Sequence, residues 1–392
     1  MLLNQQPIVE KLNQRPQVCL CAPKPMVLMY LLKWARSSIF HSCILMLAIS
    51  TGTAQAAKNI PLFESEELLE ITISGALDQL DEDRDTGITY KPATITYQDT
   101  SGKLISVNVE LHSRGEKRLS QRTCSFPPIR IEISKAERSG TLFDGKRKWK
   151  LTTQCQPKFK NYENYLITEY LSYKIFNLLT DNSYLVRLAK INYFDIPGNK
   201  TLHTTYGFFL EPTKALAKRI GRKRIKVNET SALVLDGKYM NIVSLFHFML
   251  GSTDWSATHG GREECCHNGK LFGEVDGSSN LYIPYDLDMT GLVNPEYATY
   301  DPALRLDSIR DRRYRGYCRN LGSLDANITL FNSKQAGIVA LFENTPYLSN
   351  AARKKKINYL NQFFRIINDS ARVERKIYGR CHKSIMVETG NT

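Results

Sequence analysis

Apolar and polar residues alternate in several short segments of the first half of the chain. Alternation of this kind is typical of strands that are buried on one face. The segments with this pattern are 68–73, 93–97, 104–111, 129–133 and 148–151. A turn signal, Asp-Thr-Ser-Gly at 99–102, separates two of them. We therefore predict a first half that is rich in β-strands.

The period changes after residue 160. Apolar side chains recur at helical spacing from Ile167 to Leu178, which predicts an amphipathic helix over 161–179. Two further strands are predicted at 185–194 and 205–211, and Pro212 ends the second of them. Beyond Pro212 the pattern is mainly helical. The predicted helices there are 239–250, 334–343 and 351–372, with short strands at 271–275 and 281–283.

This order of elements predicts a fold class. Strands, one helix, two more strands and then a helical half follow the order of a protein-kinase small lobe joined to a large lobe. We therefore predict an α+β protein with a mixed β-sheet small lobe over 57–211 and a mainly helical large lobe over 212–392. Many α+β folds share this order, so periodicity alone does not select one of them.

The first 56 residues have the features of a secretory signal region. Basic residues precede an apolar core at 39–49, and Ala-Gln-Ala at 54–56 provides a small-residue cleavage site. The core is short for a membrane span. We therefore expect cleavage before residue 57 and an exported product, periplasmic or secreted, without a transmembrane segment. An uncleaved anchor is the alternative, because residues 26–32 are also apolar.

The chain is basic, with a formal net charge of +14, of which the first 56 residues contribute +4. Positive charge favours acidic partners such as nucleotide phosphates, acidic polypeptides or an anionic envelope surface. Two basic runs lie at 214–226 and 310–319, and both are compatible with solvated faces. Neither run carries the interleaved aromatic residues of a nucleic-acid module. We therefore expect a protein substrate or an envelope partner and no specific nucleic acid; the pattern does not define an oligomeric state.

Six of the nine cysteines follow the signal region, and an even number in an exported chain favours disulfides. The six are Cys124, Cys155, Cys265, Cys266, Cys318 and Cys381. We expect Cys124 to pair with Cys155, because both lie near one predicted sheet. Cys265 and Cys266 are adjacent, so we expect each of them to pair elsewhere. A metal site at Cys265-Cys266-His267 fits the spacing less well, because no Cys-x-x-Cys pair completes it.

Several acidic residues lie where buried elements are predicted to end. Asp286 and Asp288 form an Asp-x-Asp pair after a strand, and two carboxylates on one side of a strand end can share a divalent cation. A pair of turn-forming aspartates is the alternative. Asp254 follows a buried helix in a polar loop, where it faces a cleft or caps a following helix.

Two basic residues lie on or after predicted strands. Lys150 lies within a strand, and a lysine that points inward requires an anion. That anion is a phosphate or a glutamate of the following helix, Glu163 or Glu169, unless Lys150 lies at a sheet edge in solvent. Arg114 ends an earlier strand, where its guanidinium is suited to phosphates.

Five short segments resemble, in their order, the CotH family of spore-coat kinase-like proteins in its exported Gram-negative branch. They are Ser-Arg-Gly at 113–115, Lys-Trp-Lys-Leu at 148–151, Tyr-Gly-Phe-Phe-Leu-Glu at 206–211, Thr-Asp-Trp-Ser at 253–256 and Ile-Pro-Tyr-Asp-Leu-Asp at 283–288. Each segment is short, and their ordered combination carries the resemblance. The resemblance implies an atypical protein-kinase fold that uses ATP and Mg²⁺ to phosphorylate Ser or Thr of a protein.

The resemblance also implies roles for individual residues. Lys150 would hold the nucleotide phosphates, Arg114 would lie over them, and Glu211 would lie near the adenine. Asp254 would orient or deprotonate the acceptor hydroxyl. Asp286 would bind Mg²⁺, and Asp288 would assist it.

The chain departs from the family pattern after Asp254, where the family usually places a metal-binding asparagine. The nearest asparagine is Asn268. It would fill this role if residues 260–266 bulge out as an insertion, and it is an ordinary turn residue before Gly269 otherwise.

Two other functions stay open. A non-catalytic pseudokinase-like envelope binding protein is favoured by the displaced Asn268 and disfavoured by the intact Asp-x-Asp pair. A basic adhesion or polysaccharide-binding protein is compatible with 20 tyrosines and 3 tryptophans, which also suit an ordinary core.

Overall fold

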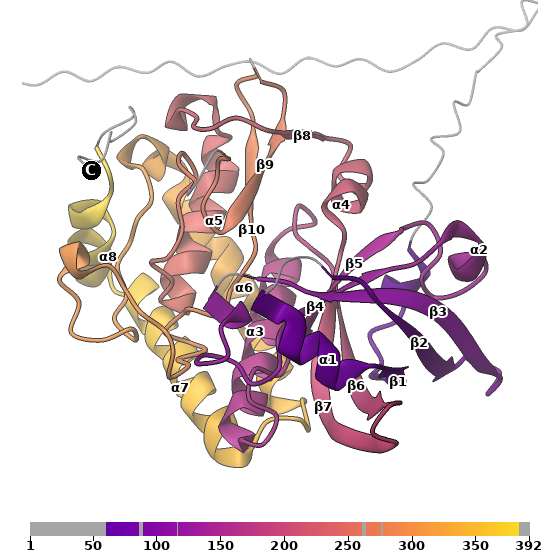
Figure 1. The fold of residues 1–392 in the computed structure, drawn as a ribbon. Helices are drawn as coiled ribbons and strands as arrows, with labels where there is room; N and C mark the ends of the chain where they lie inside the picture. The colour runs from indigo at the N-terminus through magenta and orange to yellow at the C-terminus, as the bar shows by residue number, and fades with distance from the viewer. Residues whose placement is uncertain (1–59, 86–88, 116, 261–263, 276, 384–392) are drawn as a thin grey trace, which may run out of the picture. The chain divides into compact units, whose positions relative to one another are not determined.

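Seven strands close into a barrel in the computed structural model, which describes residues 60–85, 89–115, 117–260, 264–275 and 277–383 (Figure 1). The order around the barrel is β1-β2-β3-β4-β5-β7-β6, and β1 closes it by pairing in parallel with β6. The strands are β1 (Leu69–Gly75), β2 (Lys91–Gln98), β3 (Leu104–Ser113), β4 (Ile129–Glu132), β5 (Lys148–Thr153), β6 (Val186–Asp195) and β7 (Lys200–Leu210). The predicted signal region and its cleavage site lie outside the described residues.

The barrel corrects the predicted fold class. The mixed sheet does not form the small lobe of a two-lobe kinase-like fold, because Leu69 pairs with Ala189 and the sheet closes on itself. The second half contains the two short strands that were predicted there, and β8 joins them in a three-stranded sheet in the order β10-β9-β8. The two-lobe α+β prediction is therefore wrong. The prediction failed because the alternation of apolar and polar residues shows which face of a strand is buried, but it does not show which distant strand pairs with it.

The barrel is filled with apolar side chains. Residues of β1 are alternately buried and more exposed, as a strand with one inward face requires. Side chains from several strands meet inside, among them Ile73, Ile95, Val107, Ile131 and Trp149, all fully buried. Two short helices, α1 (Leu77–Glu82) and α2 (Lys135–Arg138), accompany the strands.

Helix α3 (Lys160–Leu179) joins the barrel to the second half of the chain. It contacts β6 and β7, and it also contacts α5 and α6. Its buried residues belong to a second apolar cluster that extends through the helices after residue 212. The elements there are α4 (Thr213–Arg219), β8 (Lys223–Ile225), α5 (Gly237–Leu250), β9 (Gly269–Gly273), β10 (Leu281–Pro284), α6 (Leu324–Glu343), α7 (Asn350–Ile367) and α8 (Ser370–Lys376).

Most predicted elements occur with small shifts of their ends, and two helices differ more. The helix predicted at 334–343 begins ten residues earlier, at Leu324, because Leu324 and Phe331 are buried against the helical core. The helix predicted at 351–372 is divided into α7 and α8. Asp369 causes the break, since its side chain accepts a hydrogen bond from the Arg372 N–H and begins a new helix.

Within the described part of the chain, no helix is long and apolar enough to cross a membrane. The lobe boundary predicted between residues 211 and 212 stays a prediction.

Candidate functional site

The β9–β10 hairpin brings Asn268 next to Asp286. The two strands pair up to their ends, so Asn268, just before β9, lies beside Tyr285, just after β10. The Tyr285 N–H donates to the Asn268 carbonyl at 3.0 Å. The Asp286 N–H donates to the Tyr173 hydroxyl on α3 at 2.8 Å. The segment that carries the Asp-x-Asp pair is therefore held by both the hairpin and α3.

Asp254 lies against Asn268. Helix α5 ends at Gly251, which has φ +64°, a conformation that glycine adopts without strain, and the chain then turns toward Asp254. The Asn268 side-chain amide donates to the Asp254 carbonyl at 2.7 Å and to its carboxylate Oδ2 at 3.0 Å. Asn268 therefore does more than form the turn before Gly269, because its side chain holds the Asp254 loop.

The segment between Asp254 and Asn268 leaves this contact and returns to it. The His267 N–H donates to the His259 carbonyl at 2.7 Å, so these two residues are paired. His267 Nε2 lies 2.7 Å from Asp254 Oδ1, and this hydrogen bond raises the pKa of His267. The sequence did not indicate His267 as a neighbour of Asp254, because a lone histidine beside two cysteines carries no positional signal.

Lys150 lies on β5, opposite Arg130 on β4 and Leu210 on β7. Its Nζ is 4.9 Å from the centroid of the Tyr285 ring. Burial and the neighbouring cations Arg114 and Arg130 lower the pKa of Lys150 to about 7. Among the described residues, no carboxylate forms an ion pair with Lys150, so neither Glu163 nor Glu169, which the sequence left open as alternatives to a phosphate, is its partner.

Arg114 adds a second buried cation beside Lys150. Its Nη2 donates to the Thr152 hydroxyl at 3.5 Å, and its buried Nε has no hydrogen-bond partner in the part of the chain that the structure describes. Burial and the charge of Arg118 lower the pKa of Arg114 to about 10. We call Lys150, Arg114, Arg130 and Lys270 the cationic cluster, because the charge of each of the last three depresses the pKa of Lys150.

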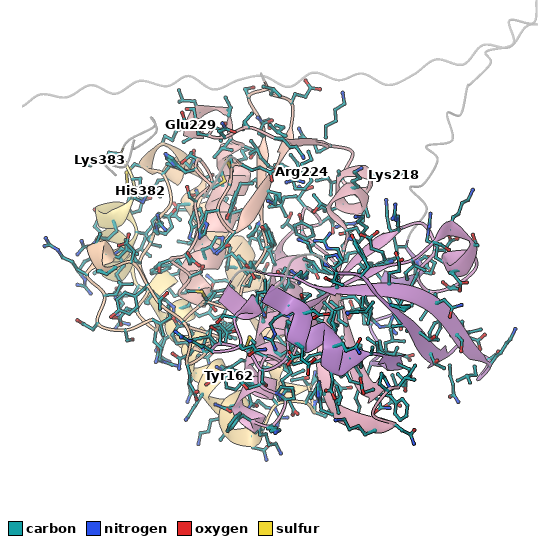
Figure 2. The ribbon with its side chains drawn as sticks, viewed as in Figure 1. Tyr162, Lys218, Arg224, Glu229, His382 and Lys383 are labelled. Atoms are coloured by element: carbon teal, nitrogen blue, oxygen red, sulfur yellow. A yellow bond between two sulfur atoms is a disulfide. The ribbon has the colours of Figure 1, made fainter. Side chains whose placement is uncertain are left out.

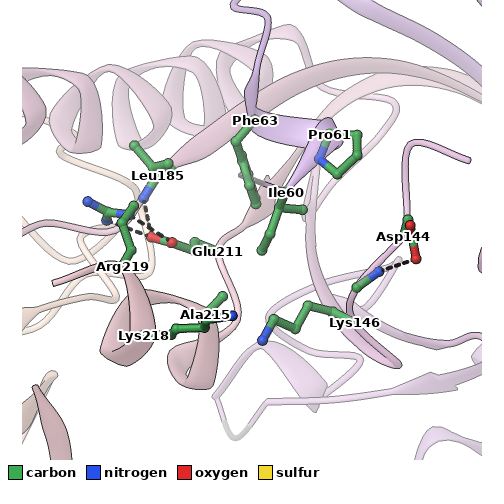
Figure 3. Close-up of a pocket in the computed structure, with 11 residues that line it drawn as sticks. Ile60, Pro61, Phe63, Asp144, Lys146, Leu185, Glu211, Ala215, Lys218 and Arg219 are labelled. Atoms are coloured by element: carbon green, nitrogen blue, oxygen red, sulfur yellow. Dashed lines mark hydrogen bonds and ion pairs between the residues drawn. The ribbon is translucent and has the colours of Figure 1, made fainter. Parts of the chain in front are cut away.

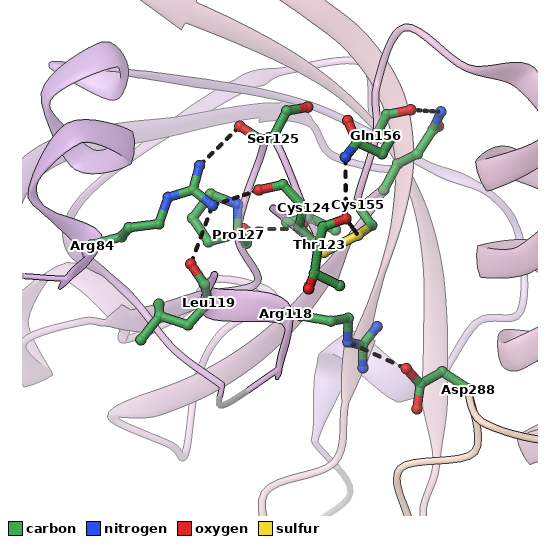
Figure 4. Close-up of a disulfide and its surroundings, with 12 residues drawn as sticks. Arg84, Arg118, Leu119, Thr123, Cys124, Ser125, Pro127, Cys155, Gln156 and Asp288 are labelled. Carbon is green, nitrogen blue, oxygen red and sulfur yellow. Dashed lines mark hydrogen bonds and ion pairs between the residues drawn. A yellow bond between two sulfur atoms is a disulfide. The ribbon is translucent and has the colours of Figure 1, made fainter. Parts of the chain in front are cut away.

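Three carboxylates and one arginine form a second cluster. Glu169 of α3, Asp286 and Asp288 make up the carboxylate cluster, and Arg118 lies between them. Arg118 Nη1 is 3.2 Å from Glu169, Nη2 is 3.2 Å from Asp286, and Nε is 3.6 Å from Asp288. Figure 4 shows Arg118 directed at Asp288.

Burial and pairing have opposite effects on the protonation of these groups. Burial raises the pKa values of the Glu169 and Asp288 carboxyls, and the Arg118 charge only partly offsets this. Burial lowers the pKa of Arg118, but the charges of the nearby carboxylates have the larger combined effect and raise this pKa well above its ordinary value. The guanidinium therefore stays charged at all ordinary pH values.

The loop that carries Arg118 is held at two points (Figure 4). Cys124 is disulfide-bonded to Cys155, just after β5, as the sequence predicts. The buried Arg84 guanidinium donates to the Cys124 carbonyl at 2.6 Å and to the Ser125 carbonyl at 2.9 Å. The sequence did not indicate Arg118, because its partners Glu169 and Asp286 lie 51 and 168 residues away.

Glu211 directly follows Leu210, the strand partner of Lys150, but its carboxylate belongs to a separate ion pair. Its carboxylate accepts from Arg219 Nε at 3.0 Å, from Arg219 Nη2 at 2.8 Å and from the Leu185 N–H at 3.1 Å. It lines a pocket of about 280 Å³ with Phe63, Lys146 and other residues (Figure 3). The structure therefore places Glu211 in a buried ion pair, and no contact of its carboxylate with Lys150 or Asp286 occurs among the described residues.

The remaining cysteines differ in part from the prediction. Cys265 and Cys266 are bonded to each other, so the expectation that each pairs elsewhere is wrong. Cys318 and Cys381, 63 residues apart, are bonded as well. The error arises because adjacency in sequence was taken to exclude a bond that the local backbone permits.

The two clusters differ in how well they fit a metal ion. In the described residues, no group of three or more His, Cys, Asp or Glu side chains is arranged to hold one. Arg118 separates Asp286 from Asp288, although their oxygens are the hard donors that Mg²⁺ prefers. The cationic cluster fits anionic phosphate better, because among the described residues Arg114 Nε has no hydrogen-bond partner and Lys150 has no carboxylate partner.

Comparison with known proteins gives little further information. No protein-family model and no curated protein matches the chain. Among solved structures, the chain is similar to the Helicobacter pylori proinflammatory kinase CtkA, with a TM-score of 0.34 and 9% identity over 62% of this chain and 89% of that chain. A TM-score of this size does not establish a shared fold, and membership of the CotH family is not shown.

Proposed function

We propose that the protein is an ATP-dependent phosphotransferase that phosphorylates Ser or Thr of a protein. One observation carries the proposal: Asp254 contacts Asn268, Asn268 contacts Tyr285 beside Asp286, and Lys150 lies over the same Tyr285 ring. Residues from β5, from the loop after α5 and from the open end of the β9–β10 hairpin thus lie around the Tyr285 ring.

The cationic cluster supplies the binding of nucleotide phosphates. A buried guanidinium with an unpaired N–H and a desolvated lysine gain most from an anion, because neither exchanges an existing ion pair for the new one. Lys150 and Arg114 would each contact phosphate oxygens. Arg118 would also turn from the carboxylates to phosphate when the nucleotide binds.

Asp286 and Asp288, with Asn268, are the residues that would hold Mg²⁺ together with phosphate oxygens. When bound, Mg²⁺ neutralises the charge of the transferred phosphoryl group. The oxygen of the acceptor hydroxyl would bond to the γ-phosphorus while the bond from that phosphorus to the β,γ-bridging oxygen breaks and ADP leaves. Asp254 would accept the proton of the hydroxyl. Asn268 and His267 would orient the Asp254 carboxylate.

Export of the protein to the periplasm or the medium is part of the proposal. Three cysteine pairs lie at bonding distance in the described residues, which suits an oxidising compartment.

A transfer assay with γ-labelled ATP, Mg²⁺ and a Ser- and Thr-containing acceptor protein tests the function. Asp286→Asn keeps the size of the side chain, and we expect it to lower the transfer rate by at least about a hundredfold. The matched control is Asp99→Asn, in the exposed β2–β3 turn, which should keep full activity. Transfer that persists in Asp286→Asn would remove Asp286 from the mechanism.

A non-catalytic binding protein is the second candidate, and the position of Arg118 favours it. The guanidinium occupies the space between Asp286 and Asp288 that a cation would otherwise take. This function predicts that ATP with Mg²⁺ gives no thermal shift in the wild type or in Arg118→Ala. A phosphotransferase predicts a shift in the wild type.

A further inference from the structure

The two basic runs of the sequence are distributed differently in the structure. Lys218 and Arg224 of the first run lie on α4 and β8 (Figure 2), and Arg224 pairs with Glu264. In the second run, Arg315 donates to the Trp255 carbonyl at 2.9 Å and Arg319 donates to the Ala232 carbonyl at 2.9 Å. These arginines support the backbone.

Arg310 and Arg312 of the second run instead line a groove with residues of α7 and α8. The groove has a volume of about 430 Å³. Its cations come from three separate segments: Arg310, Arg312, Arg365, Arg372, Arg375 and Lys376. The other lining residues are Asp311, Gln362 and Ile366. Tertiary structure thus adds three arginines and a lysine from residues 365–376 to the basic run.

The positive charge of this groove is poorly compensated from within. The Asp311 carboxylate accepts the N–H groups of Asp307 and Ser308 at 2.8 and 3.0 Å. Asp369 pairs with Arg372 at 3.0 Å. In the part of the chain that the structure describes, Arg310, Arg365, Arg375 and Lys376 form no ion pair.

Arg312 gives the groove a rigid floor. Its Nη2 donates to the Tyr359 carbonyl at 2.6 Å, and its guanidinium lies 3.6 Å from the centroid of the Tyr359 ring. Arg365 and Arg375 are exposed around it and keep their donors available. A fixed arginine surrounded by available ones suits carboxylates, because the planar guanidinium binds a carboxylate with two parallel hydrogen bonds.

We propose that this groove binds an acidic polypeptide segment, rich in Asp or Glu, of a partner protein. No aromatic side chain lines the groove to stack on bases, which disfavours single-stranded nucleic acid. The groove is concave, so a narrow peptide reaches more of its cations than a flat anionic bilayer does. The proposal does not require the phosphotransferase activity, and it concerns a separate set of residues.

The groove is also connected to the candidate site. Gly291 lies three residues after Asp288, and a side chain there would meet the Ile309 carbonyl at 2.7 Å, so the chain before Arg310 packs directly on this segment. The Tyr359 hydroxyl donates to the Arg310 carbonyl at 2.8 Å. If a partner polypeptide binds in the groove, the residues of that polypeptide next to the bound segment would therefore lie near the protein segment that follows Asp288.

Fluorescence anisotropy of a labelled oligo-glutamate peptide with the full-length protein tests the proposal. We expect binding that an oligo-glutamine peptide does not show. Arg365→Glu/Arg375→Glu should weaken it by about tenfold or more, since two exposed charges are reversed. Arg365→Gln/Arg375→Gln should give a smaller loss in the same direction. Binding should be unchanged in Asp286→Asn, which separates this proposal from the phosphotransferase.

The matched control is Lys223→Glu/Lys226→Glu, which makes the same change in net charge at exposed positions of the first basic run. It should change the affinity by less than about twofold. Equal losses in both double variants would show that net charge, and not the groove, attracts the peptide. Absence of peptide binding, or loss of binding to phosphatidylglycerol vesicles without loss of peptide binding in Arg365→Glu/Arg375→Glu, would also overturn the proposal.

Discussion

The cationic cluster and the carboxylate cluster share Asp286 as a neighbour but differ in how their charges are balanced. In the carboxylate cluster, Arg118 lies within 3.6 Å of the buried Glu169 and Asp288 and of the exposed Asp286, so each acidic side chain has a cationic partner. In the cationic cluster, Lys150 faces an aromatic ring, and Arg114 has a buried N–H without a partner among the residues that the structure describes. One cluster is complete within the protein, and the other gains from an added anion.

This difference predicts that substitutions in the two clusters affect different properties of the protein, stability in one case and ligand binding in the other. Removal of one member of a complete cluster lowers the free energy of unfolding of the protein, because a buried charge is left without a partner. An incomplete cluster already bears the cost of desolvation, so changes in it should affect ligand binding more than folding. The Glu211–Arg219 pair belongs with the complete type, and the place of Glu211 near a nucleotide, which the family resemblance implies, stays a prediction.

The largest effect is expected for Arg118→Met. It leaves Glu169 and Asp288 buried without a cation, and we expect the free energy of unfolding to fall by about 3–5 kcal/mol at pH 8. The loss should be smaller at pH 5. Both carboxyls already have raised pKa values, so the folded state binds more protons than the unfolded state, and stability falls as the pH rises.

Urea unfolding at several pH values measures this effect. Arg122→Met, at an exposed position of the same loop, is the matched control and should change stability by less than about 0.5 kcal/mol. A loss for Arg118→Met that matches the control, or that is the same at pH 5 and pH 8, would contradict the assignment of the cluster as complete.

A smaller effect is expected for Glu211→Gln. The change removes the charge from a carboxylate that is 3% exposed and accepts two hydrogen bonds from Arg219. We expect a loss of about 1.5–3 kcal/mol in the free energy of unfolding and no change in ATP affinity. Thermal unfolding and an ATP titration measure both quantities, with the exposed Glu229→Gln as the control. Weakened ATP binding with unchanged stability would return Glu211 to the nucleotide site.

The smallest effect concerns the pH dependence of ATP binding. Because the pKa of Lys150 is lowered to about 7, the free protein loses this ammonium as the pH rises through 7. In the proposed phosphotransferase, the nucleotide phosphates bind the charged form, so we expect the ATP affinity to fall by up to about tenfold, or about 1.4 kcal/mol, per pH unit above 7. Lys150→Arg keeps its charge and should give a flat profile, whereas Lys270→Arg, at a lysine paired with Glu264, should keep the slope. A flat profile in the wild type would contradict the role of Lys150.

The depressed pKa of Lys150 has an opposite consequence for folding. Its folded value lies below the unfolded value of 10.5, so the unfolded state binds more protons between pH 7 and that value. The contribution of Lys150 to stability therefore increases as the pH rises through this window.

Local pattern predicted the elements that carry the candidate site. Alternation placed Lys150 on a strand, helical spacing gave α3, and the run of apolar residues before Gly251 gave α5. Closure of the barrel was not predictable in this way, because it depends on a parallel pairing between strands 120 residues apart. The helix break at Asp369 was missed although a capping residue marks it.

The sequence by itself determined most of the strands and helices, and which acidic and basic side chains lie near their ends. Tertiary structure alone decided which charges meet. Arg118 pairs with Glu169 and Asp286. Lys150 contacts an aromatic ring, and Glu211 pairs with Arg219. The physical reason is that hydrophobic periodicity acts over a few residues, whereas ion pairs between distant segments depend on how buried faces pack together.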